Sequence, residues 1–502
     1  MTSHTIAPPA DAVERDSRRW IILSVLVVAQ FMVVLDVAIV NVALPTIKND
    51  LHFSQESLQW VITAYAVLFG GVLLLGGRMA DLLGRRRLFM LGMGIFTASS
   101  LLDGLAWSAG SLIVFRAVQG LGAALLAPAA LSILTTTFRE GRDRNVALGI
   151  WGAASGSGGA AGVLLGGALT SALSWSWIFF INVPVGLAVL AVSPVLLRES
   201  RAELDHRHFD TAGAASITGG LMLLVYALTH ASQHGWATTE TIGLLAASFA
   251  LIIAFVVIEV RSPAPLLPLR IFRLRTLSAS NINALLMGAA IFSQFFLLTL
   301  YMQQVLHYSA LKTGVAYIAL TLSIIVFSTV SQALVTRVGI RLVLPAGMAM
   351  AAGGLVLYAQ LPVHGTYFAN LFPAFLLTGV GMAFAFVPMS IGALTGVQAE
   401  DAGVASGLLN TNQQIGGAIG VAIATTIATT YTGHYVTSHP GTGALDPGAL
   451  TYGFQIAFYV LAALAALAAL ITAVMIEPGA AASAVPAEDG VGELTPAFEE
   501  AA

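Results

Sequence analysis

Asp36 is the residue of this chain whose position is most unusual for its chemistry. Most of the 25 acidic residues lie outside long apolar runs, but Asp36 stands 16 residues into the run 20–44, about 24 Å along a helix. An ionised carboxylate inside a bilayer is costly and faces a partner or a wet cavity. The position favours a proton-carrying acid over the alternative, half of a permanent ion pair.

Arg116 is the basic residue best placed to interact with Asp36. Counted from the same membrane face, Arg116 lies about 10 Å deep and Asp36 about 12 Å deep. An ion pair that breaks when Asp36 binds a proton and a permanent structural pair both fit these depths. Asp103, near the end of the run 87–107, is either a second protonatable group or, the favoured interpretation, a residue that reaches the interface.

A row of glycines marks the apolar run 145–171. Gly158, Gly162 and Gly166 recur every four residues, with Gly167 beside them. Small residues at this spacing lie along one helix face and let a second helix approach closely. The pattern predicts tight helix packing.

Amide and aromatic side chains at mid-depth are candidates for a binding cavity. Such a mixture suits a large apolar ligand with a few polar handles, although polar residues in spans often only bond neighbouring helices. The helical period turns Asp36 about 120° away from Gln30 and Asn41, toward the run that holds Arg116. The candidates are Gln30, Asn41, Tyr65, Gln294, Phe295, Asn410 and Gln414.

These residues must be positioned by helices that cross a membrane. The chain has 502 residues, of which 57% are hydrophobic and only 9% charged, against about a quarter charged in soluble domains. An unpaired backbone is not tolerated in lipid, so the spanning segments are helices. We predict an all-α integral membrane protein with fourteen spans: 20–44, 57–77, 87–107, 109–134, 145–171, 175–197, 211–231, 240–260, 277–303, 311–334, 341–361, 366–393, 403–428 and 453–476.

The basic residues predict the orientation of these spans. Nineteen of the 22 Lys and Arg residues fall on one side when the spans alternate from a cytoplasmic N-terminus, whereas only Lys48 and Lys312 fall in outer loops. Cytoplasmic loops carry the excess of basic residues. Both termini are therefore expected in the cytoplasm, with disordered tails at 1–19 and 477–502.

Several chemistries are not expected. The chain has no cysteine, which excludes disulfides and thiolate metal sites. It has no phosphate-binding loop, no HExxH sequence and no cluster of metal ligands. We therefore predict that the protein is not an enzyme, that it holds no cofactor or metal, and that its partners are a small lipophilic substrate, protons and the lipid bilayer and not nucleic acid.

Five segments together resemble the drug:proton antiporter group of the major facilitator superfamily, whose members have fourteen transmembrane helices. The resemblance covers about residues 20–476. It implies a cytoplasmic gate at Gly77, Asp81, Gly84, Arg85 and Arg86, proton coupling by Arg116, and an antiporter motif in the glycine row. The segments are Leu35 to Pro45, Gly77 to Arg87, Leu112 to Ala123, Gly158 to Gly167 and Trp177 to Pro184.

The resemblance also implies an architecture. Two six-helix bundles, 20–197 and 276–476, would flank two inserted helices in 198–275. The segment 332–341 supports related halves because it repeats the pattern of 77–87, with Gly339 opposite Gly84. Val163 stands where the group usually has proline, so a kink in that helix is less expected.

The implied function is efflux of lipophilic drugs, antiseptics or antibiotics across the bacterial cytoplasmic membrane. A monomer would exchange substrate for protons by alternating access of a central site. Two alternatives remain at this stage: a proton-coupled symporter that imports a nutrient or metabolite, and a non-transporting membrane sensor.

Overall fold

The computed structural model describes residues 10–477 apart from 54–57, 59, 139–140, 202–209, 263–264, 266, 399–400 and 444. Across these residues the chain is helical and contains no strand. The first half comprises α1 (Ala10–Asp50), α3 (Trp60–Leu83), α4 (Arg85–Gly104), α5 (Ala109–Thr137), α6 (Arg142–Ala172), α7 (Trp177–Phe180) and α8 (Asn182–Leu196). The inserted pair is α9 (Thr211–His234) and α10 (Thr239–Arg261). The second half comprises η1 (Leu269–Arg273), α11 (Arg275–Leu300), η2 (Tyr301–Val305), α12 (Ala310–Ala316), α13 (Ile318–Val338), α14 (Ile340–Tyr358), η3 (Tyr367–Leu371), α15 (Phe372–Gly392), α16 (Ala402–Ser438) and α17 (Pro447–Met475).

Each predicted apolar run coincides with one helix, or with a helix that includes a short break. Among the described residues, twelve helices are long and apolar enough to cross a membrane, and thirteen if the bent α6 is one span. Of the fourteen predicted spans, the one that is not among these helices is α4, which begins with three arginines and carries Asp103 near its end. The all-α membrane fold is confirmed, whereas the count of fourteen spans stays a prediction.

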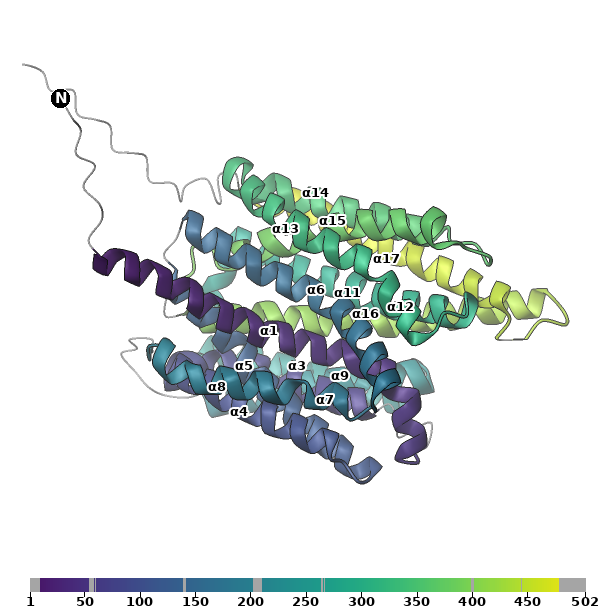
Figure 1. The fold of residues 1–502 in the computed structure, drawn as a ribbon, viewed down its shortest axis with the longest axis horizontal. Helices are drawn as coiled ribbons and strands as arrows, with labels where there is room; N and C mark the ends of the chain where they lie inside the picture. The colour runs from purple at the N-terminus through teal and green to yellow at the C-terminus, as the bar shows by residue number, and fades with distance from the viewer. Residues whose placement is uncertain are drawn as a thin grey trace, which may run out of the picture.

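The helices gather into two bundles. In Figure 1 the helices α4, α5, α7 and α8 occupy the lower part of the molecule and α13, α14, α15 and α17 the upper part, with α6, α11 and α16 between them. Contacts between the bundles run through α3 and α5 with α16 and through α6 with α12, α13 and α15. The segments that carry the predicted gate and the glycine row therefore lie at the interface between the bundles.

A glycine turn recurs at the equivalent place in each bundle. Gly84, between α3 and α4, has φ 115°, and Gly339, between α13 and α14, has φ 84°. Glycine adopts this left-handed region without steric cost. The shared geometry agrees with the internal repeat predicted from segments 77–87 and 332–341.

The first helix is longer than expected. It begins at Ala10, so residues 10–19 are helical and not disordered. Ala, Glu and Arg in this stretch favour helix, and Arg18 Nη2 donates a hydrogen bond to the carbonyl of Val195, which anchors the helix to the end of α8. The rest of the two predicted tails, 1–9 and 478–502, lies outside the described residues.

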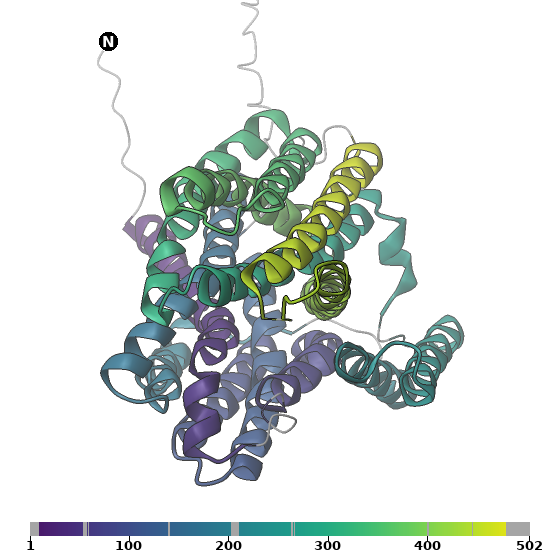
Figure 2. The same cartoon turned by 90° about the vertical axis from the view of Figure 1, so that its right-hand side faces the viewer.

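The inserted pair lies at the side of the molecule, as the end-on view in Figure 2 shows. α9 packs on α3, where Met222 lies against Gly71. It also contacts α16, and Trp236, in the turn after α9, donates a 2.7 Å hydrogen bond from Nε1 to Thr426 Oγ1. α9 therefore covers the line along which α3 and α16 meet, and α10 packs on the outside of α9.

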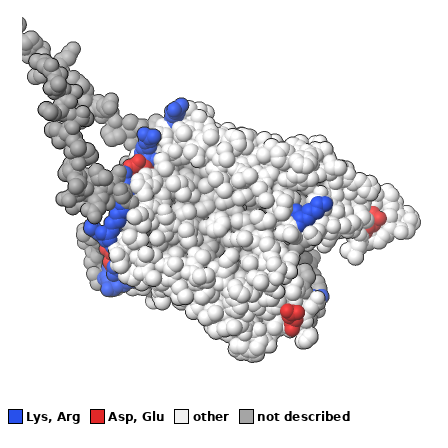
Figure 3. Space-filling model, in the orientation of Figure 1, with Lys and Arg blue, Asp and Glu red and all other residues white. Residues whose placement is uncertain are grey.

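Basic side chains gather at the end of the molecule from which α1 begins (Figure 3). We call this the basic end. Its arginines lie where α3 ends and α4 begins, where α6 and α11 begin, and where α8, α10 and α13 end. They include Arg85, Arg86, Arg87, Arg142, Arg198, Arg261, Arg275 and Arg337.

Candidate functional site

Asp36 lies in a closed polar pocket between α1, α5 and α8. Its side chain is fully buried and accepts hydrogen bonds from three residues. Arg116 Nη1 donates to Oδ2 at 2.7 Å, while Gln119 Nε2 and Asn182 Nδ2 donate to Oδ1 at 2.9 and 3.0 Å. The contact between Asp36 and Arg116 that was predicted from equal depth is confirmed.

The guanidinium of Arg116 is enclosed on several sides. Its Nε donates to the carbonyl of Val61 at 3.1 Å, and its Nη1 also donates to Gln119 Oε1. The Tyr65 ring lies 4.3 Å from the guanidinium carbon, close enough for a cation–π contact. Tyr65, which the sequence suggested as a substrate-binding residue, is thus placed beside the ion pair.

Three polar residues of this pocket had no assigned role in the sequence analysis. Gln119 and Asn182 both bind Asp36, and Asn182 also donates to Ser100 Oγ at 3.0 Å. Ser100 in turn donates to the carbonyl of Phe179 at 2.9 Å, which ties α4 to α7. The available signal was an amide inside an apolar run, but such residues often serve only helix packing.

Asp103 is a second buried acid next to this pocket. Its side chain has no solvent exposure, and neither carboxyl oxygen has a hydrogen-bond partner among the described residues. It lies close enough to Arg116 and Asp36 for their charges to interact. The interpretation of Asp103 as a residue that reaches the membrane interface is therefore not the one that its burial favours.

The predicted gate joins the two bundles at the basic end. Asp81 is fully buried and accepts hydrogen bonds from Arg85 Nη2 at 2.9 Å and Nε at 3.2 Å. Its other oxygen accepts from the backbone N–H of Val404, in the first turn of α16, at 3.3 Å. Gly77 and Gly403 let the two backbones touch beside it. The interface between α3 and α16 is therefore closed at this end.

The turn after Asp81 is held by Glu199, a residue that the sequence analysis did not single out. The N–H of Arg86 donates to Glu199 Oε1 at 3.2 Å, and a Cβ atom at Gly84 would lie 2.6 Å from the same oxygen. The Arg85 N–H donates to the carbonyl of Ser200 at 3.0 Å. Glycine at position 84 thus meets two requirements, a positive φ and room for a carboxylate.

The glycine row of α6 packs against α1 beside Asp36. Cβ atoms at Gly162 and Gly166 would lie 2.8 Å from the carbonyls of Leu35 and Ile39. The predicted close approach of a second helix is confirmed. α6 also bends by 42° between Arg142–Gly159 and Ala161–Ala172, where glycines weaken the helix without a proline.

The candidate substrate residues contact different helices. Gln30 Nε2 donates to Ser155 Oγ of α6 at 3.3 Å, and Phe295 lies 3.5 Å from a Cβ atom built at Gly159 of the same helix. Gln414 instead faces Gly70 of α3. The remaining candidates bond their own helix or are buried: Asn41 donates to Val37, Asn410 donates to Ser406, and Gln294 is 2% exposed.

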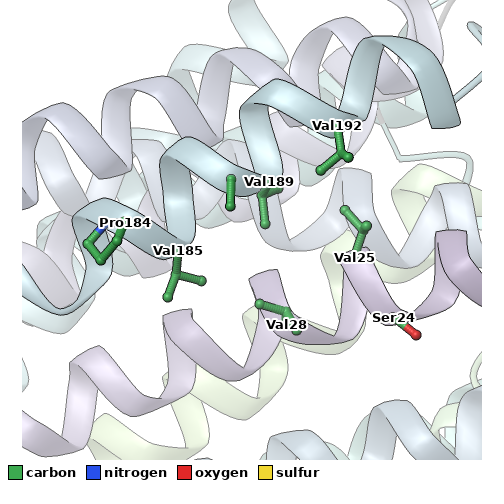
Figure 4. Close-up of a pocket in the computed structure, with 8 residues that line it drawn as sticks. Ser24, Val25, Val28, Pro184, Val185, Val189 and Val192 are labelled. Carbon is green, nitrogen blue, oxygen red and sulfur yellow. The ribbon is translucent and has the colours of Figure 1, made fainter.

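An apolar groove of about 470 Å³ lies between α1 and α8 (Figure 4). It contains none of the candidate residues. Its walls carry no charge, so it offers no proton chemistry. The lining residues are Ser24, Val25, Val28, Pro184, Val185, Ala188, Val189 and Val192.

One protein family and three known proteins are similar to this chain. The family model of the Major Facilitator Superfamily matches residues 26–421. The chain is 38% identical over 485 residues to the puromycin resistance protein pur8 of Streptomyces alboniger, which covers 96% of this chain and 95% of that protein. It is 41% identical over 396 residues to the cephamycin export protein CmcT of Amycolatopsis lactamdurans, with 78% and 82% covered. The crystal structure of the human organic anion transporter MFSD10 (TETRAN) has the same fold, with a TM-score of 0.63 at 15% identity over 93% of this chain and 100% of that one.

Proposed function

This chain belongs to the Major Facilitator Superfamily, and we propose that it exports small lipophilic drugs, antiseptics or antibiotics from the bacterial cytoplasm in exchange for protons. The protein is a multi-pass membrane protein of the drug-exporter type. Support for the substrate class comes from the names of its relatives, a puromycin resistance protein and a cephamycin export protein. We propose the cytoplasmic membrane as its location, a monomer as its working form, and the basic end with both termini as its cytoplasmic side.

The observation that carries proton coupling is the buried pair of Asp36 and Arg116 at 2.7 Å. A proton that binds Asp36 cancels the carboxylate charge and so removes the attraction to Arg116. The guanidinium has then lost the counter-ion that it contacts in this conformation, which is unfavourable in a low-dielectric site. Protonation of Asp36 thereby favours a rearrangement of α5 against α1.

The gate and the glycine row would turn that local event into transport. Asp81, Arg85 and the start of α16 hold the basic end closed in this conformation. α6 packs on α1 through the glycine row and also contacts the second bundle. A shift of α1 that follows proton binding is therefore transmitted to both bundles, which rock about a central site.

The substrate would bind between the bundles, on both sides of their interface. Gln30 and Phe295 flank α6, whereas Gln414 lies beside α3. We propose these residues, with Asn41, Gln294 and Asn410, as the polar and aromatic handles for the ligand. For Tyr65, whose ring lies 4.3 Å from the guanidinium carbon of Arg116, we propose a role in supporting the ion pair.

The variant Asp36→Asn tests the function. Asparagine keeps the size of the side chain but cannot bind and release a proton. We impose a pH gradient, acidic inside, on inverted vesicles that contain the protein. With wild-type protein we expect the vesicles to accumulate ethidium or puromycin and to release protons from the lumen as they do so. We expect Asp36→Asn to lose both activities at normal membrane abundance.

Glu240→Gln is the matched control, because the Glu240 side chain is 69% exposed and remote in sequence from the site. It should transport like wild type. Undiminished drug-dependent proton movement by Asp36→Asn would refute the proposal. An uncoupler separates export from import, because it should raise drug accumulation in intact cells that contain an exporter and lower it in those that contain a symporter.

A further inference from the structure

Two buried acids share one buried base in the first bundle. Asp36, Asp103 and Arg116 are each at most 1% exposed, and their charges interact. Arg116 forms its ion pair with Asp36. Neither oxygen of Asp103 accepts a hydrogen bond from any described residue.

The charge balance of this trio requires a bound proton. An ionised carboxylate buried without hydrogen bonds is far more costly than its neutral form. With both acids ionised the trio would carry a net negative charge, and Asp103 would bear it without a partner. A proton on Asp103 makes the trio neutral, with Asp36 as the counter-ion of Arg116.

We propose that Asp103 is a second proton-holding residue of the exporter, and that Arg116 pairs in turn with Asp36 and with Asp103 as one proton passes between the two carboxyl groups. This inference rests on the proton-coupled export proposed above. The O–H bond on Asp103 breaks and an O–H bond forms on Asp36. The trio is neutral before and after the transfer, so no net charge is buried at either stage.

The position of Asp103 suits the receiving end of such a relay. It stands one residue before the end of α4, at the end of the helix opposite the basic end, whereas Asp36 lies deeper. Protons that arrive from the outer side would therefore meet Asp103 first. Transfer of the proton from Asp103 to Asp36 neutralises Asp36, which then no longer pairs with Arg116. Asp103 is left ionised and becomes the counter-ion of Arg116.

The other groups that face Asp103 do not supply its counter-charge. Among the helices packed on α4, α5 contributes Arg116 and α3 contributes the buried Tyr65 hydroxyl, which lies close enough to Asp103 for their charges to interact. α7 and α8 contain no ionisable side chain. α1 contributes Asp36, so Arg116 is the cation that both acids share.

Infrared spectroscopy of the reconstituted full-length protein tests the proposal. A protonated carboxyl group gives a C=O stretching band that an ionised carboxylate lacks. At neutral pH we expect such a band in wild type, its loss in Asp103→Asn, and a shifted band in Asp103→Glu. We expect no band in Asp36→Asn, because Asp103 is then the ionised counter-ion of Arg116. A wild-type spectrum without the band, or a band that survives Asp103→Asn, overturns the inference.

Transport supplies a second readout. In Asp103→Asn, Arg116 has no carboxylate other than Asp36 with which to pair. We therefore expect proton-coupled ethidium efflux to fall about a hundredfold, the lower end of what a positioned proton-transfer group contributes. Asp103→Glu should restore much of the rate and its pH dependence, which a merely structural role would not predict. Thermal unfolding in detergent checks that each variant is folded.

The two proposals fail in different ways. If Asp103→Asn keeps the wild-type rate and pH profile while Asp36→Asn is inactive, the relay is wrong and proton-coupled export stands. If Asp36→Asn still couples efflux to protons, the proposed function itself is wrong. Should Asp103→Asn not fold, the band shift in Asp103→Glu decides the matter alone.

Discussion

At the scale of single residues, the site depends on hydrogen bonds that stabilise the buried ion pair of Asp36 and Arg116. The sequence was sufficient to predict the contact between Asp36 and Arg116, because charged residues are rare in apolar runs and their depths can be counted. It was not sufficient to assign Gln119 and Asn182, since an amide in a span can serve packing equally well. Burial of Asp103 was also beyond the sequence, because the end of an apolar run borders both protein and interface.

A double-mutant cycle on the ion pair is the first prediction at this scale. Arg116→Gln should destabilise the protein by about 3–5 kcal/mol, because it leaves Asp36 charged and buried without its cation. The double variant Asp36→Asn with Arg116→Gln should recover much of that loss. Thermal unfolding in detergent measures the effect, and losses that simply add within about 0.5 kcal/mol would show that the two residues are not coupled.

At the scale of elements, α1 and α6 form the pair of helices that sets the geometry of the site. The four-residue glycine spacing predicted a close helix contact, but it could not identify α1 as the partner, because any neighbouring helix would have satisfied it. The bend in α6 was also not expected, since Val163 replaces the usual proline. Successive glycines permit the bend for a different reason, the absence of side chains that would stiffen the turn.

Substitution in the glycine row tests this packing. In Gly162→Val the new side chain would meet Ala38 Cβ and the Leu35 carbonyl, each 2.8 Å from the added Cβ. Overpacking of this kind costs about 1–3 kcal/mol, and we expect a lower melting temperature together with slower efflux. Gly94→Val in α4 is the control, because nothing lies within 4 Å of a Cβ atom there. Equal effects of the two variants would contradict the assigned role.

At the scale of the whole molecule, the conformation is defined by which end of the interface between the bundles is closed. The repeat of 77–87 in 332–341 allowed two related halves to be predicted. It could not show that Asp81 bonds the first turn of α16, because residues 81 and 404 are remote in sequence. Glu199 was overlooked for the same reason: its partner Arg86 lies 113 positions away.

Weakening of the gate should shift the balance between conformations. Asp81 places a carboxylate at the N-terminus of α16, an interaction worth about 0.3–1 kcal/mol and up to about 2 when partly buried. Since the chain lacks cysteine, spin labels on Arg87→Cys and Arg341→Cys report the separation of the bundles without background. Asp81→Asn should increase the fraction of long distances between the labels.

Asp143→Asn is the control for the gate variant. Asp143 lies at the basic end too, but its partner Arg19 belongs to the same bundle, so this pair does not cross the interface. The distance distribution should stay as in wild type. If Asp81→Asn also leaves the distribution unchanged, the contact with α16 does not hold the basic end closed.

The placement of α9 has a consequence for the route by which cargo arrives. A lipophilic compound dissolves first in the bilayer, and we expect it to enter the space between the bundles laterally, through one of the two flanks where they meet. α9 shields the flank formed by α3 and α16 and is fastened there by Trp236 and Thr426. The flank beside α6 carries no such shield within the described part of the chain. Loading from the lipid would therefore be one-sided.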